Sequence, residues 1–254
     1  MFARPLACRY NTRVATGIEV AAIIFLATMI RSTFGFGEAL VAVPLLALII
    51  PVQIAAPVAV LVSVTVALIV VVQDRAHIQF RSAGLLAFST LFGIPLGLLL
   101  LRILPESVVK STLALIIAGF SAFSLLRPNG RELKDDRFAW LFGFGAGILG
   151  GAYGMNGPPL AVYGSLRRWP PGKFRATLQA YFLPASAAGM VGYWVTGLWT
   201  PAVNHYYLYA LPGVVLATLL GRIANRRISA GKFLRYVHFG LIAIGAVLLA
   251  QVIL

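Results

Sequence analysis

Arg31 and Glu38 are charged residues inside an otherwise apolar stretch, and two glycines, Gly35 and Gly37, lie between them. A charge at membrane depth is costly, so such residues usually serve function or pair with one another. We expect Arg31 to hold an anionic substrate. The alternatives are a pair with Glu38 and a position near the interface from which the side chain reaches water. For Glu38 the alternatives are proton coupling and a solvated place in a turn.

The same kind of glycine and proline interruption recurs at residues 153–163. Broken backbone at membrane depth is tolerated only where protein or a water-filled cavity satisfies the freed N–H and C=O groups. A pair of broken segments at matching places in two halves indicates a transporter's binding site. The predicted substrate-binding residues are Arg31, Gly35, Phe36, Gly37, Glu38, Gly154, Asn156, Gly157, Pro158 and, from a later apolar run, Gln179.

Helices that start after the two turns, at Ala39 and Pro159, would direct free N–H groups and the positive ends of their dipoles at the cavity. Two such ends facing each other favour an anion. Asn156 could donate its amide to an oxyanion or cap the following helix. Most polar groups in apolar runs hydrogen-bond neighbouring helices, and substrate contact is the alternative. The residues in question are Ser63, Thr65, Gln179 and Ser186.

The composition predicts a polytopic membrane protein, because 60% of the 254 residues are hydrophobic and only 11% are charged. The net charge of +14 comes from basic residues in short loops, so it indicates membrane orientation and not a nucleic-acid partner. One cysteine and three histidines offer no disulfide, redox couple or metal cluster, and we expect no cofactor. The apolar runs hold no paired carboxylates or Ser/His/Asp set, so an enzyme is not expected.

The apolar runs follow one order twice: two short or glycine-broken runs, then three long ones. The short runs are 17–33, 37–50, 138–155 and 157–168, and the long ones are 54–72, 82–101, 107–126, 176–199, 203–221 and 233–254. A shift of 120 residues aligns the halves, with Gly37 on Gly157 and Arg102 on Arg222. We predict an all-α membrane protein of two repeats, each a short broken-helix hairpin plus three long helices. Its parts are an N-terminal tail 1–16, a first repeat 17–126, a cytoplasmic linker 127–137 and a second repeat 138–254.

Charge predicts how the repeats are oriented. The loops at 74–81, 127–137, 167–175 and 222–235 hold 15 of the 21 lysine and arginine residues, which places them in the cytoplasm. Each repeat has an odd number of long spans, so the repeats should be inverted. The arginines of the N-terminal tail then fall outside, against the rule. The apolar run after them resembles a signal peptide, but its repeat partner favours a place in the mature protein.

The chain resembles the TauE/SafE family over nearly its whole length, from about 17 to 254. The residues that carry the likeness are Gly35-Phe36-Gly37 before Leu40–Pro44, Gly150-Gly151 before Gly157-Pro158-Pro159, and Lys173–Thr177 at the start of a long run. The resemblance implies a secondary transporter, an exporter of small anions such as sulfite or organosulfonates in the bacterial inner membrane. A passive anion channel is the alternative.

Glu38 stands where many relatives continue with glycine, which suggests proton coupling or a different anion. The expected partners are the anion, the lipid bilayer and a coupling proton or ion, and a homo-oligomer is left open.

Overall fold

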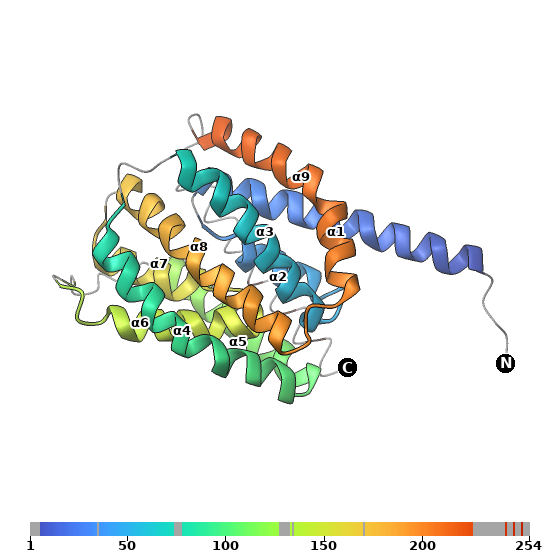
Figure 1. Cartoon of the computed structure of the whole chain (residues 1–254), viewed down its shortest axis with the longest axis horizontal. Helices are drawn as coiled ribbons and strands as arrows, with labels where there is room; N and C mark the ends of the chain where they lie inside the picture. Colours follow the sequence, from blue (N-terminus) through green and yellow to red (C-terminus); the bar gives the residue numbers. More distant parts are fainter. Residues whose placement is uncertain are drawn as a thin grey trace.

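The computed structural model describes residues 6–34, 36–73, 78–126, 133, 135–169, 171–225, 242, 246 and 250. Within these residues the protein is all-helical, without a strand (Figure 1). The helices are α1 (Leu6–Phe34), α2 (Glu38–Leu46), α3 (Val52–Gln73), α4 (Phe80–Ile103), α5 (Glu106–Leu126), α6 (Ala139–Tyr153), α7 (Gly157–Leu166), α8 (Pro171–Val195) and α9 (Pro201–Asn225).

Five of the described helices contain an apolar segment long enough to cross a membrane, which confirms the predicted fold class. These segments are Thr16–Thr33, Val52–Ile69, Phe80–Ile103, Glu106–Phe123 and Pro201–Ala224. α8 has 25 residues but is less apolar than these five. Most of the predicted long run 233–254 and most of the linker 127–137 lie outside the described residues.

α1 is longer than the predicted short run 17–33, because the helix already begins at Leu6. Most of the predicted tail 1–16 is therefore helical. The physical reason is local: residues 6–16 contain neither glycine nor proline, so no residue there interrupts a helix. The first turns of α1 project beyond the other helices (Figure 1).

The rest of α1 packs along α9, and the two helices run in the same direction. Phe25 lies next to Gly213, and Ser32 lies next to Gly221, so residue numbers increase together along both helices. Under the 120-residue offset, α1 corresponds to α6 and α9 corresponds to α4. The pair α4 and α6 should therefore pack in the same way if the halves are repeats.

α4 and α6 do pack on each other, again in the same direction and along a seam of glycines. Gly93 meets Gly147, and Gly97 meets Gly151, with backbone against backbone. Only glycine permits so close an approach, because a Cβ on either helix would collide with the other helix. One long helix of each half thus packs on the first helix of the other half: α4 packs on α6, and α9 packs on α1.

α3 and α8, which also correspond under the offset, pack antiparallel at the centre of the bundle. Ser186 Oγ donates to Ser63 Oγ at 3.3 Å, and Gly189 lies against Val60. Residue numbers rise along one helix as they fall along the other. This central pair brings polar side chains of both halves together.

α2 and α7 have 9 and 10 residues, about half of what a span requires. Each follows a turn with a glycine in the left-handed region. Gly37 has φ 98° at the start of α2, and Gly154 has φ 65° at the end of α6. These turns confirm the two predicted hairpins, α1–α2 and α6–α7.

Asp136, just before α6, fixes the end of the second hairpin that lies away from its turn. Asp136 accepts hydrogen bonds from Tyr163 Oη at 2.6 Å and Ser82 Oγ at 2.9 Å, and pairs with Arg167 at 3.4 Å. Partial burial raises the pKa of Asp136, but these donors and the guanidinium together lower it below its usual value. An ionised Asp136 therefore ties α7 to α4.

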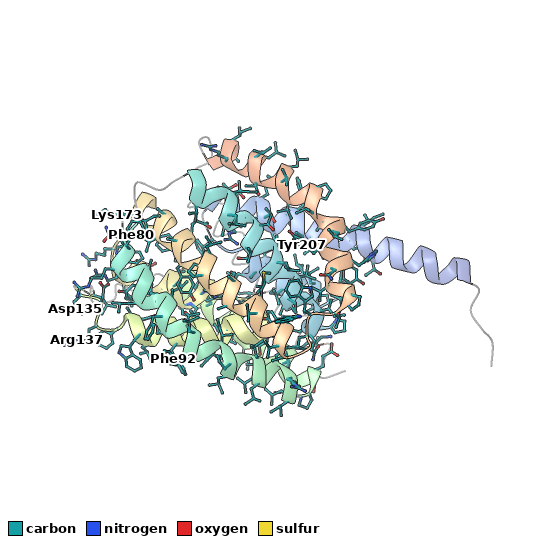
Figure 2. All side chains as sticks on the ribbon, viewed as in Figure 1. Phe80, Phe92, Asp135, Arg137, Lys173 and Tyr207 are labelled. Atoms are coloured by element: carbon teal, nitrogen blue, oxygen red, sulfur yellow. The ribbon has the colours of Figure 1, made fainter. Side chains whose placement is uncertain are left out.

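Charged residues of two predicted cytoplasmic loops lie at the same end of the bundle. In Figure 2, Asp135 and Arg137 of the linker lie on the same side of the bundle as Lys173, near the start of α8. α4 runs from this end to the opposite one, where α5 begins (Figure 1).

Candidate functional site

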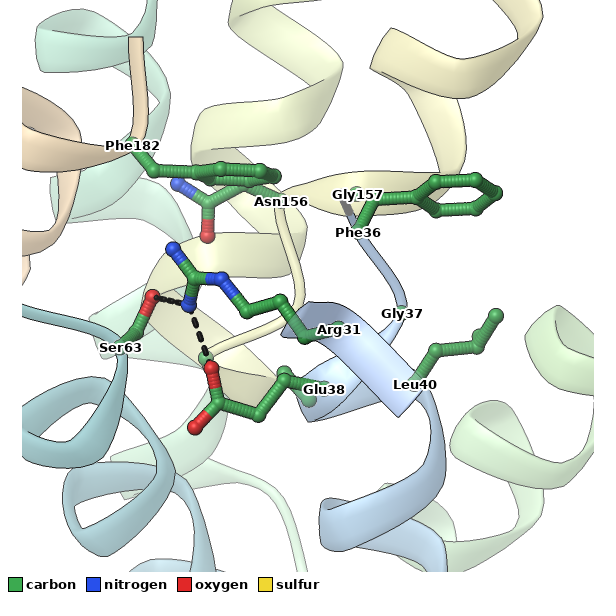
Figure 3. A pocket seen from close by; sticks show the side chains of 11 residues that line it. Arg31, Phe36, Gly37, Glu38, Leu40, Ser63, Asn156, Gly157 and Phe182 are labelled. Carbon is green, nitrogen blue, oxygen red and sulfur yellow. Dashed lines mark hydrogen bonds and ion pairs between the residues drawn. The ribbon is translucent and has the colours of Figure 1, made fainter. Parts of the chain in front are cut away.

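A small cavity lies between the two hairpin turns, and its volume is about 20 Å³ (Figure 3). That volume accommodates roughly one water molecule. The residues that line it are Arg31, Phe36, Gly37, Glu38, Ala39, Leu40, Ser63, Gly154, Asn156, Gly157 and Phe182.

The N-terminal ends of α2 and α7 both reach this cavity. α2 begins at Glu38 and α7 at Gly157, and both residues line it. The first N–H groups of a helix have no partner within the helix, and the dipole adds positive potential there. Two short helices from different halves therefore present positive ends to one small space, as the sequence predicts.

Arg31 occupies the centre of the site and is only 2% exposed. Its Nη1 group donates to Glu38 Oε2 and, at 2.6 Å, to Ser63 Oγ, while its Nη2 group donates to Gln179 Oε1 at 3.0 Å. Figure 3 shows the guanidinium between Glu38 and Ser63. Arg31 is thus paired with Glu38 and does not reach solvent in this structure.

α8 places two further side chains around Arg31. The ring centroid of Phe182 is 4.9 Å from Arg31 Cζ, a cation–π contact on the side opposite Glu38 (Figure 3). Gln179 lies one helical turn before Phe182, so both project from the same face of α8. Phe182 is not among the predicted binding residues, and its spacing from Gln179 is the sequence pattern that relates the two once the inward face of α8 is known.

The site contains two buried polar atoms without a hydrogen-bond partner among the described residues. They are Arg31 Nε and Glu38 Oε1. Buried polar atoms are nearly always satisfied, so such atoms in a cavity indicate a place for a ligand, a water molecule or a proton. Both atoms belong to the same ion pair.

Asn156 stands at the N-cap position of α7, but its side chain makes no capping hydrogen bond. Instead its Nδ2 group donates to Tyr181 Oη at 3.3 Å, and Tyr181 Oη also bonds to Thr90 Oγ1 at 2.6 Å. The amide is therefore held at the cavity wall by α4 and α8.

Seven of the ten predicted binding residues line the cavity: Arg31, Phe36, Gly37, Glu38, Gly154, Asn156 and Gly157. Gln179 contacts Arg31 from α8, whereas Pro158 is buried in α7 and does not line the cavity. Gly35 lies outside the described residues. Of the two polar candidates on α3, Ser63 joins the site and Thr65 bonds to Tyr207 Oη at 2.8 Å instead.

The family model described as Sulfite exporter TauE/SafE matches residues 20–249. The chain belongs to this family. It is therefore a multi-pass membrane protein and a transporter. A similar protein from Cupriavidus necator is described as "Probable sulfite/organosulfonate exporter TauE". It is 30% identical over 182 residues, which cover 70% of this TauE/SafE chain and 71% of that protein. No solved structure matches this chain.

The cavity of this TauE/SafE transporter offers recognition groups. It combines one guanidinium, a serine hydroxyl, an asparagine amide and two helix N-termini, all of which can donate hydrogen bonds to oxygen. In the part of the chain that the structure describes, no group of three His, Cys, Asp or Glu side chains could hold a metal ion. These hydrogen-bond donors share the cavity with the carboxylate of Glu38.

Proposed function

We propose that this protein is a secondary transporter that exports small oxyanions, sulfite or organosulfonates, across the bacterial inner membrane. The observation that carries the proposal is the buried Arg31 where the two broken hairpins meet. A sulfonate or sulfite group presents oxygens to which a guanidinium can donate two parallel hydrogen bonds. The relative from Cupriavidus necator, described as an exporter of such anions, supports the same substrate class.

The bound anion requires more space than this state provides. A cavity of about 20 Å³ suits one water molecule, whereas a sulfonate has several non-hydrogen atoms. We infer that the site is closed in this structure, because Glu38 is paired with Arg31 and little space remains beside them. Binding then requires Glu38 to move and a hairpin to shift outward.

Alternating exposure of the site follows from the arrangement of the halves, which we propose are inverted repeats. The antiparallel packing of the corresponding helices α3 and α8 supports this, because a two-fold axis that relates them must lie across the helices. Such an axis lies in the membrane plane, and the two hairpins then approach the site from opposite faces.

A topology prediction tests this arrangement. Single cysteines at Gly172, at the start of α8, and at Ser107, at the start of α5, are introduced after Cys8→Ser. In intact cells an impermeant thiol reagent should label the Ser107→Cys protein and spare the Gly172→Cys protein until the cells are opened. Labelling of the cysteine at 172 from outside would contradict the orientation.

A direct test measures transport itself in proteoliposomes. A carrier should show saturable methanesulfonate or sulfite flux and faster exchange when the same anion is present on both sides. Flux that rises linearly with concentration and shows no exchange would instead identify the passive channel. Absence of flux for both anions would contradict the proposed substrate class.

Gly157→Val tests the position of the site without disturbing the fold. A Cβ atom at Gly157 would meet no atom within 4 Å, so the side chain has room, and the residue lines the cavity. We expect methanesulfonate flux to fall at least about tenfold, with an unchanged unfolding temperature. The control is Gly145→Val on α6, which also has open space but does not line the cavity. Equal flux in the two variants would place the anion elsewhere.

A further inference from the structure

Glu38 is paired with Arg31, the side chain that the proposed function assigns to anion binding. Its Oε2 atom accepts from Arg31 Nη1, and both side chains are 3% exposed. The second carboxylate oxygen, Oε1, is buried without a hydrogen-bond partner among the described residues. One carboxylate oxygen thus neutralises the binding arginine, and the other is buried without a partner among the described residues.

A bound anion would change this balance of charge. With Arg31 engaged by the anion, an ionised Glu38 would be a second negative charge beside it in a buried site. Burial disfavours a charge without a partner, and like charges at short range raise that cost further. A neutral carboxylic acid removes both costs, and its O–H group can donate a hydrogen bond to the bound oxyanion.

Arg31 is the charged group that faces Glu38 among the described residues of the helices packed on α2. α3 has no ionisable side chain, and on α5 Glu106 and Lys110 pair with each other at 3.1 Å. On α7, Tyr163 donates to Asp136. The remaining ionisable residues of α1 lie twelve or more positions before Arg31, more than three helical turns away. Among the described residues, Glu38 is therefore the group at this site that can gain or lose a proton.

We propose that Glu38 is the proton-coupling residue of this transporter, and that each anion binds together with one proton on its carboxylate. In the empty state Glu38 is ionised and paired with Arg31. On binding, a proton from solution forms an O–H bond on Glu38, the ion pair separates, and Arg31 pairs with the anion. The site gains one positive and one negative charge, so its net charge does not change.

Two consequences follow for transport of a monovalent anion. The proton and the anion cross in the same direction, so the inward proton gradient of a cell opposes export, and the anion leaves the cell only when its own outward gradient is the larger of the two. The loaded and the empty site carry the same charge, so a membrane potential should not drive the flux. This inference rests on the proposed anion site at Arg31.

The test measures methanesulfonate affinity of the purified full-length protein by calorimetry from about pH 6 to about pH 8, where the sulfonate charge is constant. In the unaltered protein the affinity should fall by about tenfold per pH unit, since one proton is taken up per anion. Glu38→Gln imitates the protonated acid, so its affinity should be high and independent of pH. The control Glu19→Gln removes an exposed carboxylate of α1 and should keep the original slope.

A second measurement needs no variant. Titrations of the unaltered protein in two buffers of different ionisation enthalpy should give an uptake of about one proton per methanesulfonate bound. Binding with a pH-independent affinity and no proton uptake would overturn the coupling and leave the anion site intact. An unchanged pH slope in Glu38→Gln would overturn the role of Glu38. Absence of binding of both methanesulfonate and sulfite at every pH would overturn the proposed function and the coupling together.

Discussion

Arg31→Gln should abolish anion transport, with a loss of at least about 100-fold in flux. Arg31 donates to Glu38, Ser63 and Gln179, and in the proposed loaded state these donors turn to the anion. Two hydrogen bonds from a charged donor contribute roughly 1.5–3 kcal/mol each, which corresponds to at least two powers of ten in affinity. Flux in proteoliposomes, normalised to folded protein, measures the effect.

The single substitution also leaves Glu38 buried without its cation. Breaking a buried ion pair on one side costs about 3–5 kcal/mol of folding stability. The control is therefore the double variant Arg31→Gln with Glu38→Gln, which has no buried charge at this place. It should regain thermal stability and remain inactive. Normal flux in the double variant would show that Arg31 has only a structural role.

Arg31→Lys separates charge from geometry. Lysine retains the positive charge but lacks the planar fork that reaches Glu38, Ser63 and Gln179 at once. We expect partial flux, above that of the glutamine variant and well below that of the unaltered protein.

Gly97→Ala should destabilise the whole bundle. A Cβ atom at Gly97 would overlap Ile148 O and lie 2.8 Å from Ala152 N and 3.0 Å from Gly151 Cα, all of them backbone atoms of α6. Backbone cannot rotate away as a side chain can, so the helices must separate. Overpacking typically lowers the free energy of unfolding by about 1–3 kcal/mol. Because the atoms that collide here are backbone atoms, we expect a loss at or above the upper end of that range. Thermal unfolding in detergent measures the loss.

The matched control is Gly84→Ala on the same helix, where a Cβ atom would meet nothing within 4 Å. Alanine favours helix over glycine by up to about 1 kcal/mol, so this variant should be as stable as the unaltered protein or more stable. A stable, active Gly97→Ala protein would contradict the close packing of α4 on α6.

Local sequence determined the hairpins and the class of protein. Hydropathy and run length predict membrane helices, and the glycines at 37 and 154 predict where those helices break, because each feature depends only on neighbouring residues. The same local features placed Arg31 and Glu38 on either side of one turn. The sequence left a pair with Glu38 as an alternative to anion binding by Arg31, and in the structure the two side chains are paired.

Tertiary structure decided which distant residues complete the site. Ser63 is 32 residues from Arg31 and Gln179 is 148 residues from it, and both reach it because α3 and α8 cross antiparallel at the centre. Apolar helices present similar surfaces all round, so hydropathy does not specify which face of α8 turns inward. Phe182 was missed for this reason.

Tertiary structure also gives different surroundings to glycines that stand at equivalent positions in the two repeats. Gly93 and Gly213 match at the 120-residue offset, yet a Cβ atom at Gly93 would collide with backbone of α6, whereas one at Gly213 would only touch the Phe25 ring at 3.7 Å. Gly37 and Gly157 match as well, but only Gly37 needs a positive φ. Sequence determines that a glycine is present. Whether its missing side chain serves a turn, a helix contact or an open cavity depends on what the rest of the chain places beside it.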